Sequence, residues 1–352
     1  MRRDGSDALP AMRRAFDALR GRGGGTVLPS PVKTVRRLTG WARRAAGRRD
    51  PRGLILLYHR IARPPIDPWN LCVSPENFAA HVAALQQYAR VVPLTELLAA
   101  TVSAPTERPP VAITFDDGYV DNLRVALPIL TEAGVPATVF VTTGSLGSDQ
   151  PFWWDRLAWI ILRPVTLPED LHLDQPDGAF RWRDGGLGGR RRLHRSLWTS
   201  LRMLEGETRD AALDRLARWS GSDADPLEAG RPLTPLEVAE LGDNGVMSVG
   251  SHTVTHRPLP RLPLERQRQE ILESLDTCAR ITGRRPATFS YPHGEADPAA
   301  IEIARESGLA VACAGNEALV SADSDPCALP RVSVHDWSGP LFSRWLRWYW
   351  LP

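Results

Sequence analysis

The 352-residue sequence predicts an α/β protein whose parallel strands form a distorted (β/α) barrel of about seven strands with a helical insertion. Between residues 53 and 340, short apolar runs of strand length alternate with amphipathic segments of helix length. Repeated units of this kind favour a parallel sheet covered by helices. The alternation stops between residues 151 and 231, and this segment is too long to be a plain loop. We therefore expect it to be an insertion in the barrel.

The first half of the barrel is predicted from apolar runs and from helix-start signals. Ser74 stands at a capping position and Pro75 at the first turn, a combination that begins helices. Buried parallel strands are apolar on both faces, as the expected strands here are. The expected strands are 54–58, 90–94, 111–115 and 137–143, and the expected helices are 74–88, 95–100 and 121–133.

The same alternation resumes after the insertion. Thr234 and Glu237 have the spacing of a capping box, which marks the start of a helix. Within the insertion, the pattern predicts a helical piece over 190–219. The remaining expected helices are 234–243, 262–283 and 297–308, and the remaining expected strands are 246–252, 287–292 and 309–314.

The two ends of the chain differ from the barrel in composition. Residues 1–52 carry 13 Arg and one Lys against four Asp, so this basic arm has a net charge of +10 and the other 300 residues about −8. The composition of this arm predicts a helix that lies at the surface of an anionic membrane. The alternative is that the arm is a solvated or disordered leader. No nucleic-acid-binding motif accompanies it, so we expect no such partner. Residues 341–352 form a tail rich in Trp.

Location is predicted from missing signals. No apolar core of a signal peptide follows the N-terminal arginines, and no apolar run is long enough to cross a membrane. The four cysteines lack the spacing of a metal knuckle or a disulfide framework, which is typical of a reducing compartment. We therefore expect a cytoplasmic protein that contacts the inner membrane peripherally.

The candidate catalytic and metal-binding residues lie where predicted strands end. Asp116 and Asp117 are adjacent carboxylates directly after an apolar strand, where unpaired charges are costly. His252 and His256 follow another strand at a spacing of four residues. In a parallel barrel the carboxyl ends of the strands meet at one rim, so we expect these side chains to lie together.

A divalent metal ion would explain the paired carboxylates. If the segment from His252 to His256 is helical, both imidazoles project from one face and can bind the same ion. The ion would neutralise one aspartate, and the other could accept a proton from metal-bound water. Two imidazoles and one carboxylate are typical of a hydrolytic zinc site, with cobalt, nickel or iron as alternatives.

These residues resemble a known family. Residues 114–119 (TFDDGY) and 252–256 (HTVTH) look like the first two motifs of the NodB-homology polysaccharide deacetylases, carbohydrate esterase family 4. Residues 57–59 (LYH) and 289–294 (FSYPHG) add to the resemblance, which covers roughly residues 53–337.

The resemblance implies a role for each matching residue. Asp116 would be the general base, and Asp117, His252 and His256 would bind the metal ion, with zinc the expected metal. The backbone N–H of Tyr119 would help to hold the oxyanion. The implied reaction removes an N-acyl group, with acetyl expected, from an amino sugar in a polysaccharide, oligosaccharide or glycolipid.

The chain departs from the family pattern in two places. Ser290 stands where many members have an Arg that orients the catalytic aspartate, and Arg331 is the expected replacement. Members commonly use a late histidine as general acid, and His335 matches that motif loosely, with His59 and His293 as rivals. The residues expected to contact substrate are Pro292, His293 and His59.

Two other functions remain open. The same site chemistry would suit a hydrolase of a non-sugar amide. The missing motif Arg and the uncertain general acid would also suit a non-catalytic carbohydrate-binding protein, although the complete Asp-Asp-His-His set argues against it.

Overall fold

The computed structural model describes most of the chain that follows the basic arm. The predicted arm over residues 1–52 lies outside the described residues, apart from Arg52. The described residues are 52–103, 108–164, 166–168, 170–173, 180–183, 186–222 and 230–350.

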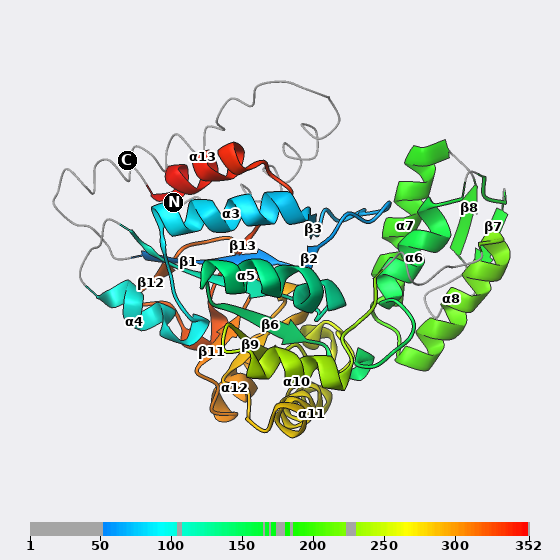
Figure 1. Ribbon diagram of the computed structural model, residues 1–352. Helices are drawn as coiled ribbons and strands as arrows, with labels where there is room; N and C mark the ends of the chain where they lie inside the picture. The colour runs from blue at the N-terminus through cyan, green and yellow to red at the C-terminus, as the bar shows by residue number, and fades with distance from the viewer. Residues whose placement is uncertain are drawn as a thin grey trace, which may run out of the picture. The chain divides into compact units, whose positions relative to one another are not determined.

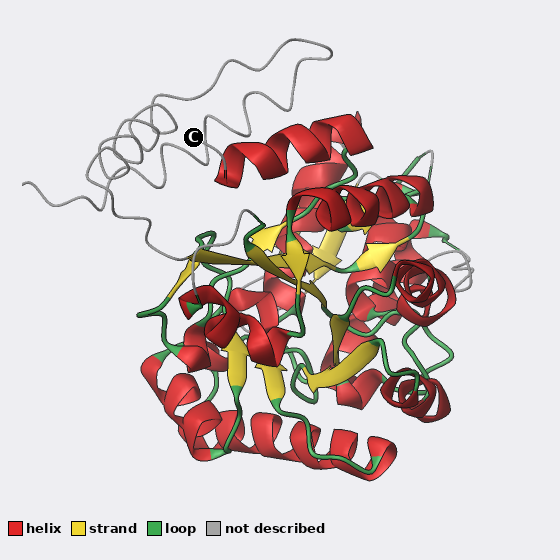
Figure 2. Ribbon diagram, turned by 60° about the vertical axis from the view of Figure 1, so that its left-hand side comes forward, coloured by secondary structure: helices red, strands yellow, loops and turns green. Residues whose placement is uncertain are grey.

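A parallel sheet of seven strands forms a half-barrel flanked by helices, which confirms the predicted fold class (Figures 1 and 2). The strand order is β11-β10-β9-β6-β5-β1-β13, with β4 beside the start of β5 and β12 antiparallel to the start of β1. The strands are β1 (Arg52–Tyr58), β4 (Arg90–Val91), β5 (Pro110–Phe115), β6 (Ala137–Val141), β9 (Met247–Ser251), β10 (Thr288–Ser290), β11 (Val311–Cys313), β12 (Val320–Ser321) and β13 (Val332–Ser333). A separate short parallel pair joins β2 (Arg60–Ile61) and β3 (Cys72–Val73).

One segment near the end of the chain links the two edges of this sheet. The N–H of Leu329 donates to the carbonyl of Ala312, and the N–H of Ala314 donates to the carbonyl of Leu329, so the segment forms a bridge to β11. A few residues later, Val332 in β13 pairs with Leu56 in β1. The segment therefore connects the two edges of the half-barrel.

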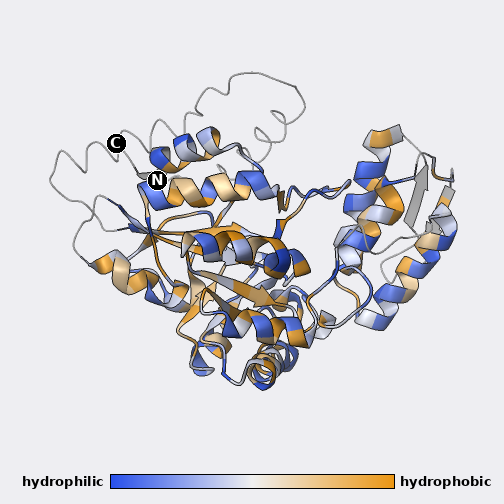
Figure 3. Cartoon of the chain, viewed as in Figure 1, coloured by the Kyte–Doolittle hydropathy of each residue, from blue (hydrophilic) through white to orange (hydrophobic). Residues whose placement is uncertain are grey.

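The side chains of strand β5 point alternately to the two faces of the sheet. Val111 and Phe115 belong to the apolar core shared with the surrounding helices, whereas Ala112 packs among residues of the barrel interior. Because side chains alternate along a strand, Thr114 and then Asp116 continue the interior row. The strands are hydrophobic along most of their length (Figure 3), so Asp116 enters an interior that is largely apolar.

The helices of the barrel begin and end near the predicted positions. The capping box of α10 is confirmed: the N–H of Glu237 donates to Thr234 Oγ1 over 3.2 Å, and the N–H of Thr234 donates to Glu237 Oε2 over 2.9 Å. The helices are α3 (Pro75–Tyr88), α4 (Leu97–Val102), α5 (Leu127–Ala133), α10 (Pro235–Asp243), α11 (Leu264–Thr282), α12 (Pro298–Glu306) and α13 (Gly339–Trp350). Shorter helical turns are Leu94–Glu96, Asn122–Ala126, Thr143–Ser145, Leu259–Arg261, Pro292–Gly294 and Pro326–Ala328.

Three local predictions were wrong in detail. Helix α3 begins at Pro75 as expected, but the Ser74 hydroxyl does not cap it and instead donates to Asp336 Oδ1 over 2.7 Å. The strand expected over 90–94 ends at Val91, because the chain enters a helical turn at Leu94. The helix expected over 121–133 starts with a wider π-type turn before α5.

The insertion folds as helices around their own apolar core. It consists of α6 (Trp153–Leu162), the antiparallel strands β7 (Asp170–Leu173) and β8 (Phe180–Arg183), α7 (Gly186–Leu201) and α8 (Gly206–Ser220). The single helical piece predicted over 190–219 is two helices. A turn at residues 202–204 separates them, and both pack against α6. Tyr119 of the barrel belongs to the same apolar core as the buried residues of α6.

The tail forms helix α13, which packs on α3. Phe342 is fully buried and its ring stacks on His81, with ring centroids 4.0 Å apart. Leu346, one turn later, is also fully buried. None of the helices in the described part of the chain is long and apolar enough to cross a membrane.

We expect Phe342→Ala to lower the free energy of unfolding by about 3–5 kcal/mol, because a buried aromatic side chain leaves a cavity when it is truncated. The measurement is urea denaturation followed by tryptophan fluorescence. Leu341→Ala is the matched control, because Leu341 is 45% exposed and should change stability by only about 0.5 kcal/mol. Equal effects of the two substitutions would mean that α13 adds no specific packing to the barrel.

Candidate metal and catalytic site

The turn after β5 sends the two adjacent carboxylates in different directions. Asp117 has a φ of 75° and Gly118 a φ of 84°, so two successive residues are left-handed. A Cβ at Gly118 would lie 2.9 Å from Cγ1 of Val141, which is closer than packing allows. Glycine therefore suits this position on both backbone and steric grounds. Asp116 stays in the barrel interior, and Asp117 faces the histidine loop that follows β9.

The histidine loop is irregular, so the predicted helical turn from His252 to His256 was wrong. Thr253 and His256 both have positive φ, of 65° and 58°, and the N–H of His256 donates to Thr253 Oγ1. Glu270 of α11 holds the loop by accepting hydrogen bonds from the N–H groups of Val254 and Thr255, each 2.9 Å long. Tight turns, rather than helical spacing, bring the imidazoles together.

Asp117, His252 and His256 form a compact buried group. Asp117 Oδ1 lies 3.6 Å from His252 Nε2 and 3.3 Å from His256 Nε2. The three candidate ligand atoms all lie within 4.8 Å of one another. This spacing allows one ion to contact all three.

The chemistry of these groups fits a divalent cation. Burial raises the pKa of Asp117, an effect that nearby histidines only partly offset, so its negative charge lacks full compensation. Burial lowers the pKa of His256 to about 4 and also lowers that of His252, so both imidazoles are neutral at pH 7 and can offer a lone pair. His252 Nδ1 lies 2.7 Å from the carbonyl oxygen of Ser290, to which it donates, which leaves Nε2 as the lone-pair atom facing Asp117.

Asp116 is paired with Arg331 in the barrel interior. Arg331 Nη1 donates to Asp116 Oδ1 and Nη2 donates to Oδ2, both over 2.7 Å. Ser290 joins them, because its Oγ accepts from Arg331 over 2.7 Å and donates to Asp116 over 3.3 Å. Burial alone would raise the pKa of Asp116, but the charge of Arg331 and its hydrogen bonds hold this pKa well below its usual value. Asp116 is therefore ionised at neutral pH.

The other predicted histidines occupy different positions around this group. His59 follows β1, and the carbonyl of Tyr58 just before it accepts from the N–H of Asp116 over 3.0 Å, so His59 and Asp116 stand at neighbouring strand ends. Burial lowers the pKa of His59, and the charges of Asp117 and Asp116 oppose this shift only in part. The ring of His293 lies 4.6 Å from that of His256, and Pro292 beside it is buried.

His335 lies apart from these histidines. Its Nδ1 is 3.2 Å from the carbonyl oxygen of Asn70, and its ring contacts Trp337. Within the described part of the chain, no hydrogen bond, ion pair or ring contact joins His335 to Asp116, Asp117 or His252.

Tyr119 makes contacts through both its backbone and its side chain. The carbonyl of Gly118 and the N–H of Val120 pair with the segment at Arg231–Leu233, so the N–H of Tyr119 points away from that segment. The side chain is buried in the insertion core.

Sequence reasoning did not identify several residues that contact the site. Glu270 lies in the middle of an amphipathic helix, where an acidic residue carries no distinguishing pattern. Trp154 packs on His256 and Trp198 on His293, with ring centroids 4.6 Å and 5.3 Å apart. The Trp cluster at the start of the insertion was the available signal, but its partners depend on the tertiary fold.

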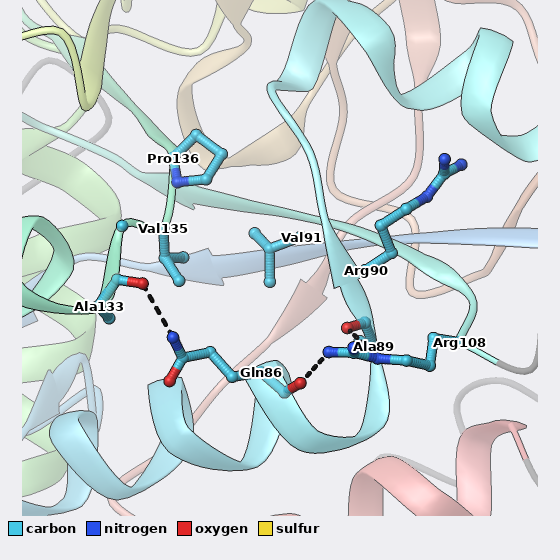
Figure 4. A pocket seen from close by; sticks show the side chains of 9 residues that line it. Gln86, Ala89, Arg90, Val91, Arg108, Ala133, Val135 and Pro136 are labelled. Carbon is cyan, nitrogen blue, oxygen red and sulfur yellow. Dashed lines mark hydrogen bonds between the residues drawn. The ribbon is translucent and has the colours of Figure 1, made fainter.

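A separate hollow lies at the opposite end of the barrel (Figure 4). It has a volume of about 670 Å³ and is lined by residues near the starts of strands, among them Arg90, Val91, Arg108 and Val135. None of the predicted site residues lines it. Because parallel barrels carry their functional groups at the carboxyl ends of the strands, we do not assign this hollow a role in catalysis.

A parallel barrel with ionisable side chains gathered at the carboxyl ends of its strands is the arrangement of a barrel enzyme. The model of the polysaccharide deacetylase family matches residues 103–185 and 202–312, more than half of the chain. The protein therefore belongs to the polysaccharide deacetylase family, as the resemblance of its motifs predicted.

Similar proteins agree with this assignment. YxkH of Bacillus subtilis (strain 168), which is classed with the polysaccharide deacetylases, is 36% identical over 95 residues. That match spans 26% of this chain and only 33% of YxkH.

Solved structures show the fold over a longer stretch. The deacetylase PplD of Streptococcus pyogenes, solved with acetate, has a TM-score of 0.53 at 19% identity, over 83% of this chain and 96% of PplD. IcaB of Ammonifex degensii has a TM-score of 0.54 at 19% identity, over 85% of this chain and 97% of IcaB. At this identity the likeness concerns the fold alone.

We expect Arg331→Met to lower the free energy of unfolding by about 3–5 kcal/mol at pH 7, because it leaves Asp116 buried without its partner. The pKa of Asp116 should then rise, since burial is no longer opposed. In the wild-type protein the pair stabilises the fold fully above the unfolded-state pKa of about 4, and this stabilisation is lost only below it, as the pH falls toward the lowered folded-state pKa of Asp116. Between pH 8 and pH 4 it is the variant whose stability changes, because its Asp116, with a raised pKa, takes up a proton there. The deficit of the variant should therefore be largest at neutral pH and shrink as the pH falls toward about 4.

The measurement is urea denaturation from pH 4 to pH 8. Arg268→Met is the control, because Arg268 pairs with Glu306 at the surface and such pairs contribute about 0–1 kcal/mol. A deficit that did not depend on pH would show that Arg331 acts by packing alone.

Proposed function

We propose that this protein is a metal-dependent hydrolase that removes an N-acyl group, with acetyl expected, from an amino sugar of a carbohydrate or glycolipid. Family membership supports a deacetylase and a carbohydrate substrate. The observation that carries the metal-dependent mechanism is the buried group of Asp117, His252 and His256 beside an aspartate that Arg331 keeps ionised.

Asp117, His252 and His256 would hold the metal ion, with zinc the expected metal and cobalt, nickel or iron as alternatives. When bound, such an ion polarises a carbonyl group and lowers the pKa of a coordinated water. His252 is oriented for this task by its hydrogen bond to Ser290, and the loop carrying His256 is fixed by Glu270.

Asp116 would act as the general base. Its carboxylate lies 3.8 Å from His252 Nε2, close enough to accept a proton from a water at the same site. Arg331 orients both carboxylate oxygens of Asp116, taking the part of the motif Arg that Ser290 replaces. The N–H of Tyr119 would donate to the oxygen of the acyl group as charge develops on it.

The leaving amine needs a proton donor. The sequence favoured His335, whereas His59 directly follows Tyr58, whose carbonyl accepts from the N–H of Asp116. We therefore propose His59 as the general acid, with His293 as a second candidate and Pro292 beside it as a substrate contact. His335 stays a prediction from the motif, and its contact with Asn70 would have to break for it to serve.

We expect the protein loaded with zinc to release acetate from N-acetylated amino-sugar oligosaccharides. Asp116→Asn should lower kcat by about 100-fold or more while the metal content is retained, because a general base typically contributes that much. His256→Ala should lose the metal as well. The measurements are acetate release by an enzyme-coupled assay and metal content by elemental mass spectrometry.

Glu302→Gln is the matched control, because this carboxylate lies on the surface in an exposed ion pair. Release of acetate from small N-acyl amides but from none of the sugars would favour the non-sugar alternative. If zinc, cobalt and nickel all fail to bind, the non-catalytic alternative is favoured.

Contact with an anionic membrane stays a prediction from the basic arm, which lies outside the described residues, and a cytoplasmic location stays a prediction from the missing signal segment and the cysteine pattern. We expect deletion of residues 1–50 to weaken binding to liposomes that contain anionic lipid, because the arm has a net charge of +10 whereas the other 300 residues sum to about −8. The measurement is co-sedimentation with liposomes at two salt concentrations. Equal binding of the full and shortened chains would remove the membrane from the proposal.

A further inference from the structure

Different contacts orient the imidazole rings of the two histidines of the candidate metal site. His252 donates from Nδ1 to a backbone carbonyl, which is the usual way in which proteins orient a metal-binding imidazole. The Nδ1 atom of His256 is buried and has no hydrogen-bond partner among the described residues. The orientation of the His256 ring must therefore come from other contacts.

Those contacts are aromatic rings. The ring of His256 lies 4.6 Å from Trp154, 4.6 Å from His293 and 4.8 Å from His252, measured between centroids. Trp154 differs from the two histidines because it belongs to α6, in the insertion. The insertion thus supplies one of the aromatic rings that pack against His256.

Trp154 is itself held by specific contacts. Its Nε1–H donates to the hydroxyl of Tyr119 over 2.7 Å, and its ring stacks on Phe152 with centroids 4.6 Å apart and planes at 7°. The Tyr119 hydroxyl in turn donates to Asp155 Oδ2 over 2.6 Å. A tyrosine hydroxyl has one hydrogen to donate, so accepting from Trp154 and donating to Asp155 fixes its direction.

The same chain of contacts reaches the other half of the site. Tyr119 is two residues from Asp117, and its ring is also covered by the guanidinium of Arg60 at 4.4 Å. Movement of the Tyr119 side chain would therefore disturb Trp154 and the turn that presents Asp117. One helix of the insertion contacts both the His256 ring and the carboxylate turn.

We propose that Trp154 and Asp155 are positioning residues of the candidate metal site: Trp154 sets the plane of His256, and Asp155 fixes Trp154 through the Tyr119 hydroxyl. This inference rests on the proposed function, because it presumes that His256 binds a metal ion. It assigns a role to the start of α6 that goes beyond packing of the insertion core.

The first experiment measures the dissociation constant for Zn²⁺ of the full chain by competition with a chelating dye. Trp154→Leu should weaken zinc binding by about 10-fold or more, in the range seen when residues that orient metal ligands are lost. Trp154→Phe, which keeps a ring but loses the N–H, should fall between this variant and the wild type. The absorption spectrum of the Co²⁺-loaded protein should change in the same order, since it reports the geometry of the ligands.

Trp159→Leu is the matched control. Trp159 lies on the same helix and is equally buried, 3% exposed against 5% for Trp154, but has no contact with a site residue in the described part of the chain. We expect it to lower the melting temperature comparably and to leave zinc affinity within about 3-fold of wild type. Equal losses of zinc affinity in the two Leu variants would overturn the inference, because general weakening of the insertion would then explain both.

Asp155 is tested by a pair of substitutions. Asp155→Asn keeps an oxygen that can accept from Tyr119, whereas Asp155→Ala does not. Zinc affinity and kcat should fall in the Ala variant, with KM changing less, and should recover largely in the Asn variant. No difference between the two would contradict the role of Asp155. A wild-type protein that bound no zinc would contradict the proposed function itself, and this inference with it.

Discussion

The buried ion pair between Asp116 and Arg331 is the constraint on which the site depends. A lone carboxylate in an apolar barrel would take up a proton and lose its value as a base, and a lone guanidinium there would destabilise the fold. Together they place an ionised oxygen pair at the carboxyl ends of the strands. Asp117 is then free to face His252 and His256. The two adjacent acids can thus serve different purposes, since Asp116 is paired with a cation and Asp117 faces two imidazoles.

Both the insertion and the barrel contact the candidate site. Tyr119 belongs to the apolar core of the insertion, and its neighbours in sequence carry the carboxylates. Trp154 and Trp198 reach from the insertion to the rings of His256 and His293. The metal ligands of the proposal therefore lie between two cores, one on each side. Changes to the insertion can alter the site without touching any ligand.

Much of the fold could be predicted from the sequence because apolar periodicity and capping signals are local. The α10 capping box depends on two residues three positions apart, and the start of α3 on one proline. The convergence of Asp116, Asp117, His252 and His256 followed from the rule that parallel strand ends share a rim. The reason for the His252–His256 approach could not be predicted, since it depends on positive φ angles held by Glu270 from a distant helix. The aromatic contacts of α6 and the isolation of His335 likewise depend on packing between remote segments.

The segment that links the two edges of the sheet also carries the partner of Asp116. Arg331 stands next to β13 and lies 215 residues along the chain from Asp116. During synthesis, β5 emerges long before this arginine exists, and until then its carboxylate has no cation to meet in the interior. The late segment therefore supplies both the last parallel strand at this edge of the sheet and the partner of its buried carboxylate. A chain that ended before residue 329 would lack both. The last strand pairing of the sheet and the ion pair of Asp116 therefore become possible at the same stage of synthesis.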